Sequence, residues 1–128
     1  MRKQVVRSLA APAAIGPYSQ AIRAGGMLFV SGQIAIDPAD GALIADPAIA
    51  AQTRRALANL SEILIAAGAA RSHVVRTTVF LKDMNDFAEM NRVYAEFFGT
   101  WAPARSTVAV TRLPRDAGVE IDCIAVLD

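Results

Sequence analysis

The feature that most constrains the fold is an amphipathic helical segment followed closely by a strand. Asp46 and Pro47 mark its start, because Asp can cap free backbone N–H groups and Pro suits the first helical position. Gly68 is a fitting end. Apolar side chains recur on one stripe at Ile49, Ala56, Leu60, Ile63 and Ala67. The following segment 73–82 is rich in Val and Thr and predicts a strand.

A second amphipathic helix is predicted after that strand. Asp86, with Glu89 three residues later, resembles a capping box, and the helical pattern runs up to Gly99. Its apolar positions are Phe87, Met90, Tyr94 and Phe97. Two helices that each carry one apolar stripe must bury it against another layer, which favours packing on a sheet.

Further strands are predicted on both sides of this helical centre. They cover 4–7, 18–24, 27–33, 105–111 and 119–127. Gly25-Gly26 fits a tight hairpin turn that requires positive φ. The order β-β-β-α-β-α-β-β predicts an α+β fold in which both helices cover one face of the sheet. The uncovered face must meet water or another subunit.

Length and composition narrow the possible chemistry. The 128 residues fit a single domain, 1–128, and the net charge of +1 provides no basic field for a polyanion. The single cysteine, Cys123, and the single histidine, His73, exclude an intrachain disulfide, a Cys-based zinc cage and a multi-histidine metal site, and they disfavour Ser-His or Cys-His catalysis. Cys123 is interpreted as a small core residue, and His73 as a structural or solvated one. Chemistry must therefore come from Arg, carboxylates, Tyr, hydroxyls and backbone amides.

The first residues only faintly resemble a signal peptide. Arg7 and Pro12 interrupt the apolar stretch that such a peptide needs. No apolar run approaches the length of a membrane span. We therefore expect a cytoplasmic protein with no membrane partner.

Arg105 and Glu120 are the strongest candidates for chemistry. Arg105 opens a strand, where its guanidinium could hold a carboxylate through two parallel hydrogen bonds, or could simply face solvent. Glu120 lies in an apolar strand, where it could orient or deprotonate water, or could pair with a surface cation. If the last two strands form a hairpin, Glu120 lies opposite Val110, and Arg105 is roughly 17 Å away at about 3.4 Å per residue. Either these strands are not neighbours, or Arg105 and Glu120 meet across a subunit boundary.

Three weaker candidates lie at loop edges and on the second helix. Tyr18 offers a ring and a hydroxyl, and Gly32 lets a ligand approach main-chain N–H groups. Asn91 could contact a ligand or serve as a buried structural amide.

Several short motifs occur together in a fixed order from about Gly16 to Leu127, nearly the whole chain. They are Gly16-Pro17-Tyr18-Ser19-Gln20, Ser31-Gly32-Gln33, Val79-Phe80-Leu81-Lys82-Asp83, Phe87 with Asn91 and Tyr94, Pro103-Ala104-Arg105-Ser106, Leu113-Pro114 and Val119-Glu120-Ile121. In this combination the chain resembles the RidA family, also called the YjgF/YER057c/UK114 family. The resemblance implies a chorismate-mutase-like α+β fold with a mixed sheet, and a homotrimer with ligand clefts at its three subunit interfaces.

The resemblance also implies an activity. It is hydrolytic deamination of reactive enamine or imine intermediates, chiefly 2-aminoacrylate (2-iminopropanoate), to a 2-keto acid and ammonia. No cofactor is expected, because an imine is already electrophilic. By this resemblance Arg105 would clamp the substrate carboxylate and Glu120 would position the attacking water. The pocket would be lined by Tyr18, Ser31, Gly32 and Asn91.

One position departs from the pattern that the resemblance implies. Thr107 stands where many relatives have Cys, two residues after Arg105. Its hydroxyl can still hydrogen-bond substrate or water, so we expect hydrolysis to survive without a thiol at this position.

Three other functions stay open at this point. Relatives act as deaminases of catabolic enamines such as 2-aminomuconate. RNA binding or endoribonuclease activity is a second alternative, although the net charge of +1 and the lack of a basic run with aromatics count against a nucleic-acid partner. A non-catalytic ligand-binding or holdase protein is the third, which the pairing of Arg105 with Glu120 disfavours.

Overall fold

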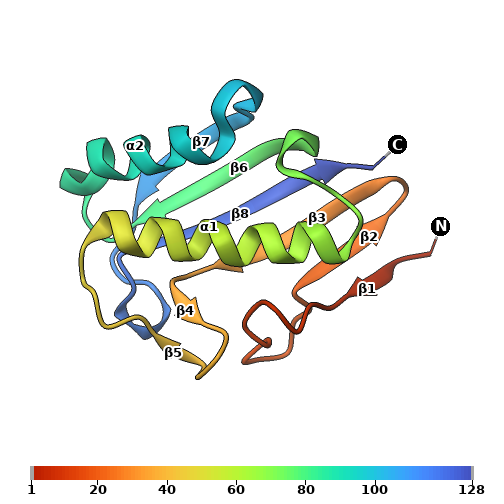
Figure 1. Cartoon of the computed structure of the whole chain (residues 1–128), viewed down its shortest axis with the longest axis horizontal. Coiled ribbons are helices and arrows are strands. Elements are labelled where there is room, and N and C mark those ends of the chain that lie inside the picture. Colours follow the sequence, from red (N-terminus) through yellow and green to blue (C-terminus); the bar gives the residue numbers. More distant parts are fainter. Residues whose placement is uncertain (1, 128) are drawn as a thin grey trace.

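The computed structural model describes residues 2–127, and its elements are shown in Figure 1. The strands are β1 (Gln4–Val6), β2 (Ala21–Ala24), β3 (Met27–Gln33), β4 (Ile36–Asp37), β5 (Ala42–Leu43), β6 (Val74–Leu81), β7 (Ala104–Ala109) and β8 (Val119–Val126). The helices are α1 (Ile49–Ala66) and α2 (Phe87–Phe98), and short 3-10 turns cover Arg71–His73, Met84–Asp86, Gly99–Trp101 and Pro114–Asp116. None of these helices is both long and apolar enough to cross a membrane.

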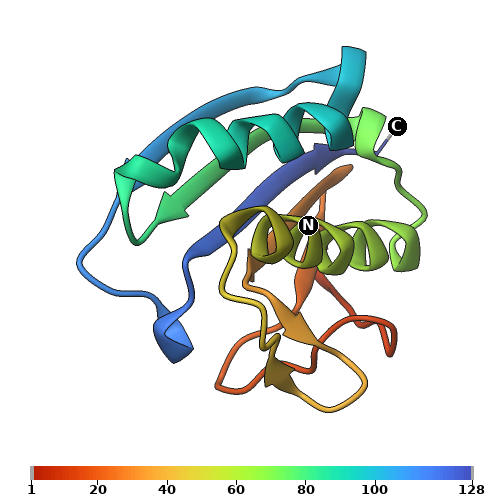
Figure 2. The same ribbon diagram turned by 60° about the vertical axis from the view of Figure 1, so that its left-hand side comes forward.

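Six strands form one mixed sheet in the order β1-β2-β3-β8-β6-β7. Only β6 and β7 run parallel, joined through α2, whereas all other neighbours are antiparallel. Both helices lie on the same face of this sheet (Figures 1 and 2). The predicted α+β class, the mixed sheet and the chain order of its six strands and the two helices are confirmed. The two-stranded β4–β5 ribbon was not predicted.

The hairpin of the first part forms as expected. Gly25 and Gly26 have φ values of 57° and 78° between β2 and β3. Two consecutive positive φ values match the tight hairpin turns that follow the twist of antiparallel strands.

The two predicted helix starts differ in outcome. Asp46 accepts the N–H of Ala48 at 2.9 Å in a turn, and α1 begins only at Ile49 without a side-chain cap. Asp86 is the N-cap residue of α2, as predicted, but its side chain makes no capping hydrogen bond, and the capping box does not form. Short polar side chains stabilise turns as readily as helix starts, so the pattern at Asp46 placed the start of α1 a few residues early.

The core lies between the two helices and the sheet. It contains fully buried side chains from α1, α2 and the central strands, among them Leu57, Leu60, Met90, Val79 and Ile121. Cys123 is buried in this layer, and burial raises the pKa of its thiol to about 12. His73 accepts the N–H of Ala70 through Nδ1 at 2.9 Å. Both residues therefore have the structural roles that the sequence predicts.

The opposite face of the sheet carries apolar side chains, and neither α1 nor α2 covers it. Val5, Ile22, Phe29 and Ile124 stand opposite one another across four neighbouring strands. Val5 is 49% and Phe29 42% exposed. A contiguous apolar sheet face of this kind is typical of a surface that another molecule covers.

Candidate functional site

Arg105 and Glu120, the two main site candidates, lie two strands apart and on opposite faces of the sheet. β6 lies between β7 and β8, so these strands are not neighbours. Arg105 stands opposite Thr77 on β6, whereas Glu120 stands opposite Phe80. Three residues along β6 and two strand spacings put their Cα atoms about 14 Å apart. Thr77 faces the helices and Phe80 faces the other way, so Arg105 and Glu120 project from opposite faces.

The first group of candidates lies between α2 and the edge strand β7. The half-buried guanidinium of Arg105 lies over the Tyr94 ring, 4.7 Å from its centroid, and 5.7 Å from the centroid of Phe87. Tyr94 in turn shares a 2.7 Å hydrogen bond with Thr77. Burial raises the pKa of Tyr94, against the opposing effects of this hydrogen bond and of the Arg105 charge. The phenol thus stays neutral and provides a flat apolar support for Arg105.

Two polar atoms beside Arg105 are buried without a hydrogen-bond partner. They are Oδ1 of Asn91 on α2 and Oγ1 of Thr107 on β7. Buried polar atoms are normally paired, and two further unpaired ones in the described residues, Nε of Arg23 and Oγ1 of Thr53, lie elsewhere. Because the pair on α2 and β7 lies on the two elements that hold Arg105, this place is a candidate ligand-binding position. We call Arg105, Asn91 and Thr107 the arginine group.

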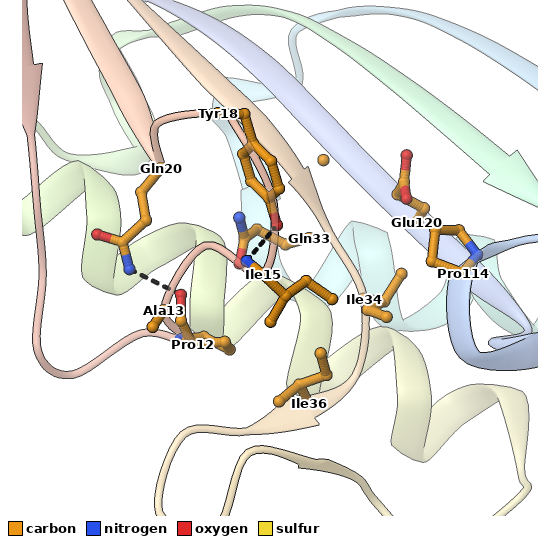
Figure 3. Close-up of a pocket in the computed structure, with 11 residues that line it drawn as sticks. Pro12, Ala13, Ile15, Tyr18, Gln20, Gln33, Ile34, Ile36, Pro114 and Glu120 are labelled. Atoms are coloured by element: carbon orange, nitrogen blue, oxygen red, sulfur yellow. Dashed lines mark hydrogen bonds between the residues drawn. The ribbon is translucent and has the colours of Figure 1, made fainter.

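The second group lines a pocket of about 140 Å³ on the other side of the sheet (Figure 3). Tyr18, Gly32 and Glu120 meet there with apolar side chains. The apolar part of the lining comprises Pro12, Ala13, Ile15, Ile34, Ile36 and Pro114. We call this the glutamate pocket. Burial, and to a lesser degree the charge of Asp122, raises the pKa of the Glu120 carboxyl, which makes it a better proton acceptor when ionised.

The glutamate pocket depends on a close approach between Glu120 and the backbone of Gly32. A Cβ atom at Gly32 would lie 2.5 Å from Oε2 of Glu120. Only glycine therefore fits at this position with Glu120 in its present place. The sequence indicated Gly32 for backbone access by a ligand, and the structure adds a packing reason.

A β-bulge brings Gly32 to this position. The register between β3 and β8 shifts between Val30 and Gln33. Ser31 donates its N–H to the carbonyl of Gln20 at 2.9 Å and its hydroxyl to the carbonyl of Ser19 at 2.6 Å. Gln33 donates its side-chain amide to the carbonyl of Ser31 at 3.1 Å. The Ser31 hydroxyl is thus used to hold the bulge, while Gly32 lines the pocket.

The loop before β2 forms the remaining wall of the pocket. The buried amide of Gln20 accepts the N–H of Ser8 at 2.7 Å and donates to the carbonyl of Pro12 at 2.8 Å. Tyr18 accepts the N–H of Ile15 through its hydroxyl at 3.4 Å, as Figure 3 shows. These bonds fold the Pro-rich segment over the mouth of the pocket.

Sequence reasoning missed the supporting residues of the arginine group. Tyr94 and Phe87 were interpreted as apolar helix positions and as part of a family motif, but no role beside Arg105 was given to them, although they flank its guanidinium. Their spacing with Asn91 does contain the signal, because residues three and four apart share one helix face. A polar residue between two aromatic residues on such a face indicates a site that uses both polar and aromatic side chains.

The described residues offer no obvious metal site. Within 2–127, no three His, Cys, Asp or Glu side chains gather in an arrangement that could hold a metal ion. The chemistry available at the two groups is therefore that of a guanidinium, hydroxyls, an amide and a desolvated carboxylate.

Comparison with known proteins matches the whole of this architecture. The family model described as Endoribonuclease L-PSP matches residues 8–127. A RutC family protein of Pyrococcus horikoshii is 54% identical over 123 residues, which are 96% of this chain and 97% of that protein. The mouse protein named 2-iminobutanoate/2-iminopropanoate deaminase is 45% identical over 124 residues, 97% of this chain and 91% of its own length.

A solved structure shares the fold. The crystal structure of TdcF from E. coli with bound serine superimposes with a TM-score of 0.92 at 42% identity, covering 98% of this chain and 99% of that one. Together, the matched family model and relatives at 45–54% identity show that the chain belongs to the RidA family, which is also named YjgF, L-PSP or RutC.

Proposed function

We propose that this protein hydrolyses small enamine and imine intermediates of the 2-aminoacrylate (2-iminopropanoate) type to 2-keto acids and ammonia. The observation that carries the proposal is the pair of complementary half-sites: a supported guanidinium beside two unpartnered polar atoms, and a desolvated carboxylate in a pocket. A relative at 45% identity is named as an imine deaminase, and a further relative of the same fold holds an amino acid with a carboxylate.

A complete site requires a second subunit in this proposal. The arginine group and the glutamate pocket lie on opposite faces of one sheet, so no side-chain rotation brings them to one small substrate. We propose a homotrimer, in which the arginine group of one subunit faces the glutamate pocket of the next. Two features support this assembly: the uncovered apolar sheet face, and the place of Arg105 on the edge strand β7, where a neighbour can reach it.

Substrate binding follows from the chemistry of the arginine group. Arg105 would hold the substrate carboxylate through two parallel hydrogen bonds. The hydroxyl of Thr107 would donate a further bond to this carboxylate. Oδ1 of Asn91 can only accept a hydrogen bond, so it would take one from the imine N–H.

Glu120 would then drive the addition of water. The enamine first gains a proton from solvent at its methylene carbon and becomes the imine in its protonated, iminium form. Glu120 takes a proton from water as the water oxygen bonds to the imine carbon, whose C=N electron pair moves to nitrogen. The carbinolamine formed in this way receives the proton from Glu120 on nitrogen, which restores the carboxylate of Glu120. Ammonia then leaves with the C–N electron pair while the hydroxyl oxygen forms the new C=O and releases its proton to solvent.

Removal of the guanidinium tests the proposed binding mode. We expect Arg105→Ala to lower kcat/KM by about 100-fold or more in an assay that couples pyruvate release to a serine or threonine dehydratase, because charge-assisted hydrogen bonds contribute about 1.5–3 kcal/mol each. Arg92→Ala is the matched control. Arg92 pairs with Glu89 and Glu96 on the exposed side of α2, where ion pairs contribute little. Unchanged activity in Arg105→Ala would refute the proposed mechanism.

Mixing two inactive variants tests the interfacial site. A trimer that contains both Arg105→Ala and Glu120→Gln subunits has one interface at which an intact arginine group faces an intact glutamate pocket. If equal amounts are unfolded and refolded together, random assembly leaves about one quarter of all sites intact, and about one quarter of the activity should return. A mixture no more active than its parents would show that both residues act within one subunit.

The substrate itself and the compartment are parts of the same proposal. Comparing rates on a short amino-acid imine and on a ring-cleavage enamine such as 2-aminomuconate would separate the two deaminase functions. A cytoplasmic location stays a prediction.

A further inference from the structure

One wall of the glutamate pocket is held from behind by a buried amide on α1. Asn59 is 0% exposed. Its Nδ2 donates to the carbonyl of Ile34 at 3.1 Å and to the carbonyl of Ile36 at 2.8 Å. Both of these residues line the pocket, and the same short segment begins at Gly32. Asn59 thus links the pocket wall to α1 through hydrogen bonds to two backbone carbonyl groups.

A second residue fixes the orientation of this amide. Arg55 lies one turn earlier on α1 and donates to Oδ1 of Asn59 from Nε at 3.1 Å and from Nη2 at 2.8 Å. A guanidinium can only donate, so it forces the amide oxygen toward itself and the amide N–H groups toward the wall. All the polar atoms of the Asn59 side chain are therefore satisfied in one orientation, which makes the anchor specific.

The wall that Asn59 holds is the one that touches Glu120. Gly32 lies so close to Oε2 of Glu120 that it leaves no room for a methyl group. The bulge that presents Gly32 is fixed upstream by the bonds of Ser31 to the strand-β2 side, and downstream by the bonds of Asn59. Loss of the downstream anchor would let the segment 32–36 move outward and admit water to the carboxylate.

We propose that Asn59 is a positioning residue for Glu120, acting through the backbone of residues 32–36, with Arg55 setting its orientation. For catalysis this inference rests on the proposed role of Glu120. Its physical content, that α1 controls the hydration of the carboxylate, can be measured without any substrate.

The surroundings of Glu120 determine whether the entry of water raises or lowers the pKa of its carboxyl group. The charged or titratable groups near it are Asp122 on its own strand and Tyr18 from the loop before β2. The neighbouring positions on β3 and β6 are Gly32 and Phe80, and the loop after β7 contributes Pro114. Since burial is the main cause that raises the pKa of Glu120, admission of water lowers that pKa toward its ordinary value.

The test is a direct titration of the glutamate carboxyl groups by NMR. The chain has four glutamates, so selective ¹³C labelling gives few signals, and Glu120→Gln identifies the one that belongs to Glu120. We expect the pKa of Glu120 to fall in Asn59→Ala. In Leu64→Ala, which removes a buried side chain from the same helix without touching the wall, we expect it to stay unchanged.

The outcomes separate this inference from the proposed function. An unchanged Glu120 pKa in folded Asn59→Ala would overturn the inference, as would an equal fall in Leu64→Ala. If Asn59→Ala does not fold, the same titration is made on Arg55→Leu. Arg55 is only half-buried, and its loss frees the Asn59 amide to rotate. An unchanged Glu120 pKa in Arg55→Leu would also overturn the inference. A wild type without deaminase activity would refute the proposed function and leave the titration valid.

Discussion

Replacing Gly32 by alanine should separate catalysis from stability in a single substitution. A Cβ at this position would lie 2.5 Å from Oε2, 2.7 Å from Cδ and 2.9 Å from Cγ of Glu120. Ordinary van der Waals contact requires roughly 3.5 Å, so the carboxylate must move by about 1 Å. Misplacement of a reacting group by about 1 Å can cost about 100-fold in rate, which corresponds to about 2.7 kcal/mol of transition-state stabilisation.

The fold should tolerate this change. Gly32 is not among the glycines with positive φ, so alanine can adopt its backbone conformation. The clash falls on a side chain, which can turn toward solvent. A compatible Gly→Ala change also stabilises by about 0.4–1 kcal/mol through the unfolded state. We therefore expect the free energy of unfolding in urea to change by less than about 1 kcal/mol, while kcat/KM in the dehydratase-coupled assay falls about 100-fold.

A double-variant cycle shows whether the effect passes through Glu120. In a Glu120→Gln background, Gly32→Ala should cost little further activity, because the group that it displaces no longer acts as a base. Activity of Gly32→Ala within twofold of the wild type would refute the argument that this contact sets the position of the base. An equal loss in both backgrounds would refute the route through Glu120.

Two further expectations concern the titration of Glu120 and the hydroxyl of Thr107. In the proposed mechanism Glu120 acts in its ionised form, so kcat/KM should fall as pH drops through its raised pKa, and Glu120→Gln should abolish this limb of the profile. The pKa of the Glu120 carboxyl is higher in the folded than in the unfolded protein, so this group stabilises the fold below its unfolded pKa and loses that stabilisation as pH rises through its folded pKa. Glu120→Gln should therefore raise Tm at pH 7 and leave Tm nearly unchanged at pH 4. Thr107→Val removes a buried hydroxyl that has no partner within the subunit, so KM should rise about fivefold, the equivalent of about 1 kcal/mol, with no loss of Tm. A lower Tm with unchanged KM would show that the hydroxyl serves the fold instead.

The elements that local patterns predicted well are those with long periodic segments. The stripe from Ile49 to Ala67 contains enough turns to identify α1, and alternation identifies β8. The β4–β5 ribbon was not predicted, because strands of two residues are too short to show an alternating pattern. Only its turn was visible, where Asp37 accepts the N–H of Ala39 and Gly41 adopts a φ of 72°.

The strand order could not follow from local patterns at all. β7 and β8 are consecutive in the chain, which favours a hairpin, yet β6 lies between them because α2 carries the chain from β6 to a parallel neighbour. The sequence left two explanations for the distance between Arg105 and Glu120. The first, that their strands are not neighbours, is confirmed, but it does not bring the two side chains together.

The anchoring residues of the site were also invisible, for a different reason. Asn59 falls among the buried positions of α1, and an amide between apolar positions has no defined partner until the helix is placed on the sheet. Its partners are carbonyls of Ile34 and Ile36, more than 20 residues earlier in the chain. A polar residue inside an apolar stripe is a signal that something must satisfy it, although the sequence does not name the partner.

Arg105 and Glu120 lie on opposite faces of the sheet, and this division suggests a functional as well as a structural role for the uncovered apolar face. Strand alternation fixes Arg105 toward the helices and Glu120 away from them, and no rotamer carries a side chain through a hydrogen-bonded sheet. A shift of one residue that brought Glu120 to the helix side would also turn Ile121 and Cys123, which are buried in the core, toward solvent. The core therefore fixes each half-site on its own face. The catalytic pair that we propose can then form only if the face that carries Glu120 is covered by a surface that carries the arginine group. The partly exposed apolar row from Val5 to Ile124 offers area on which such a surface could pack.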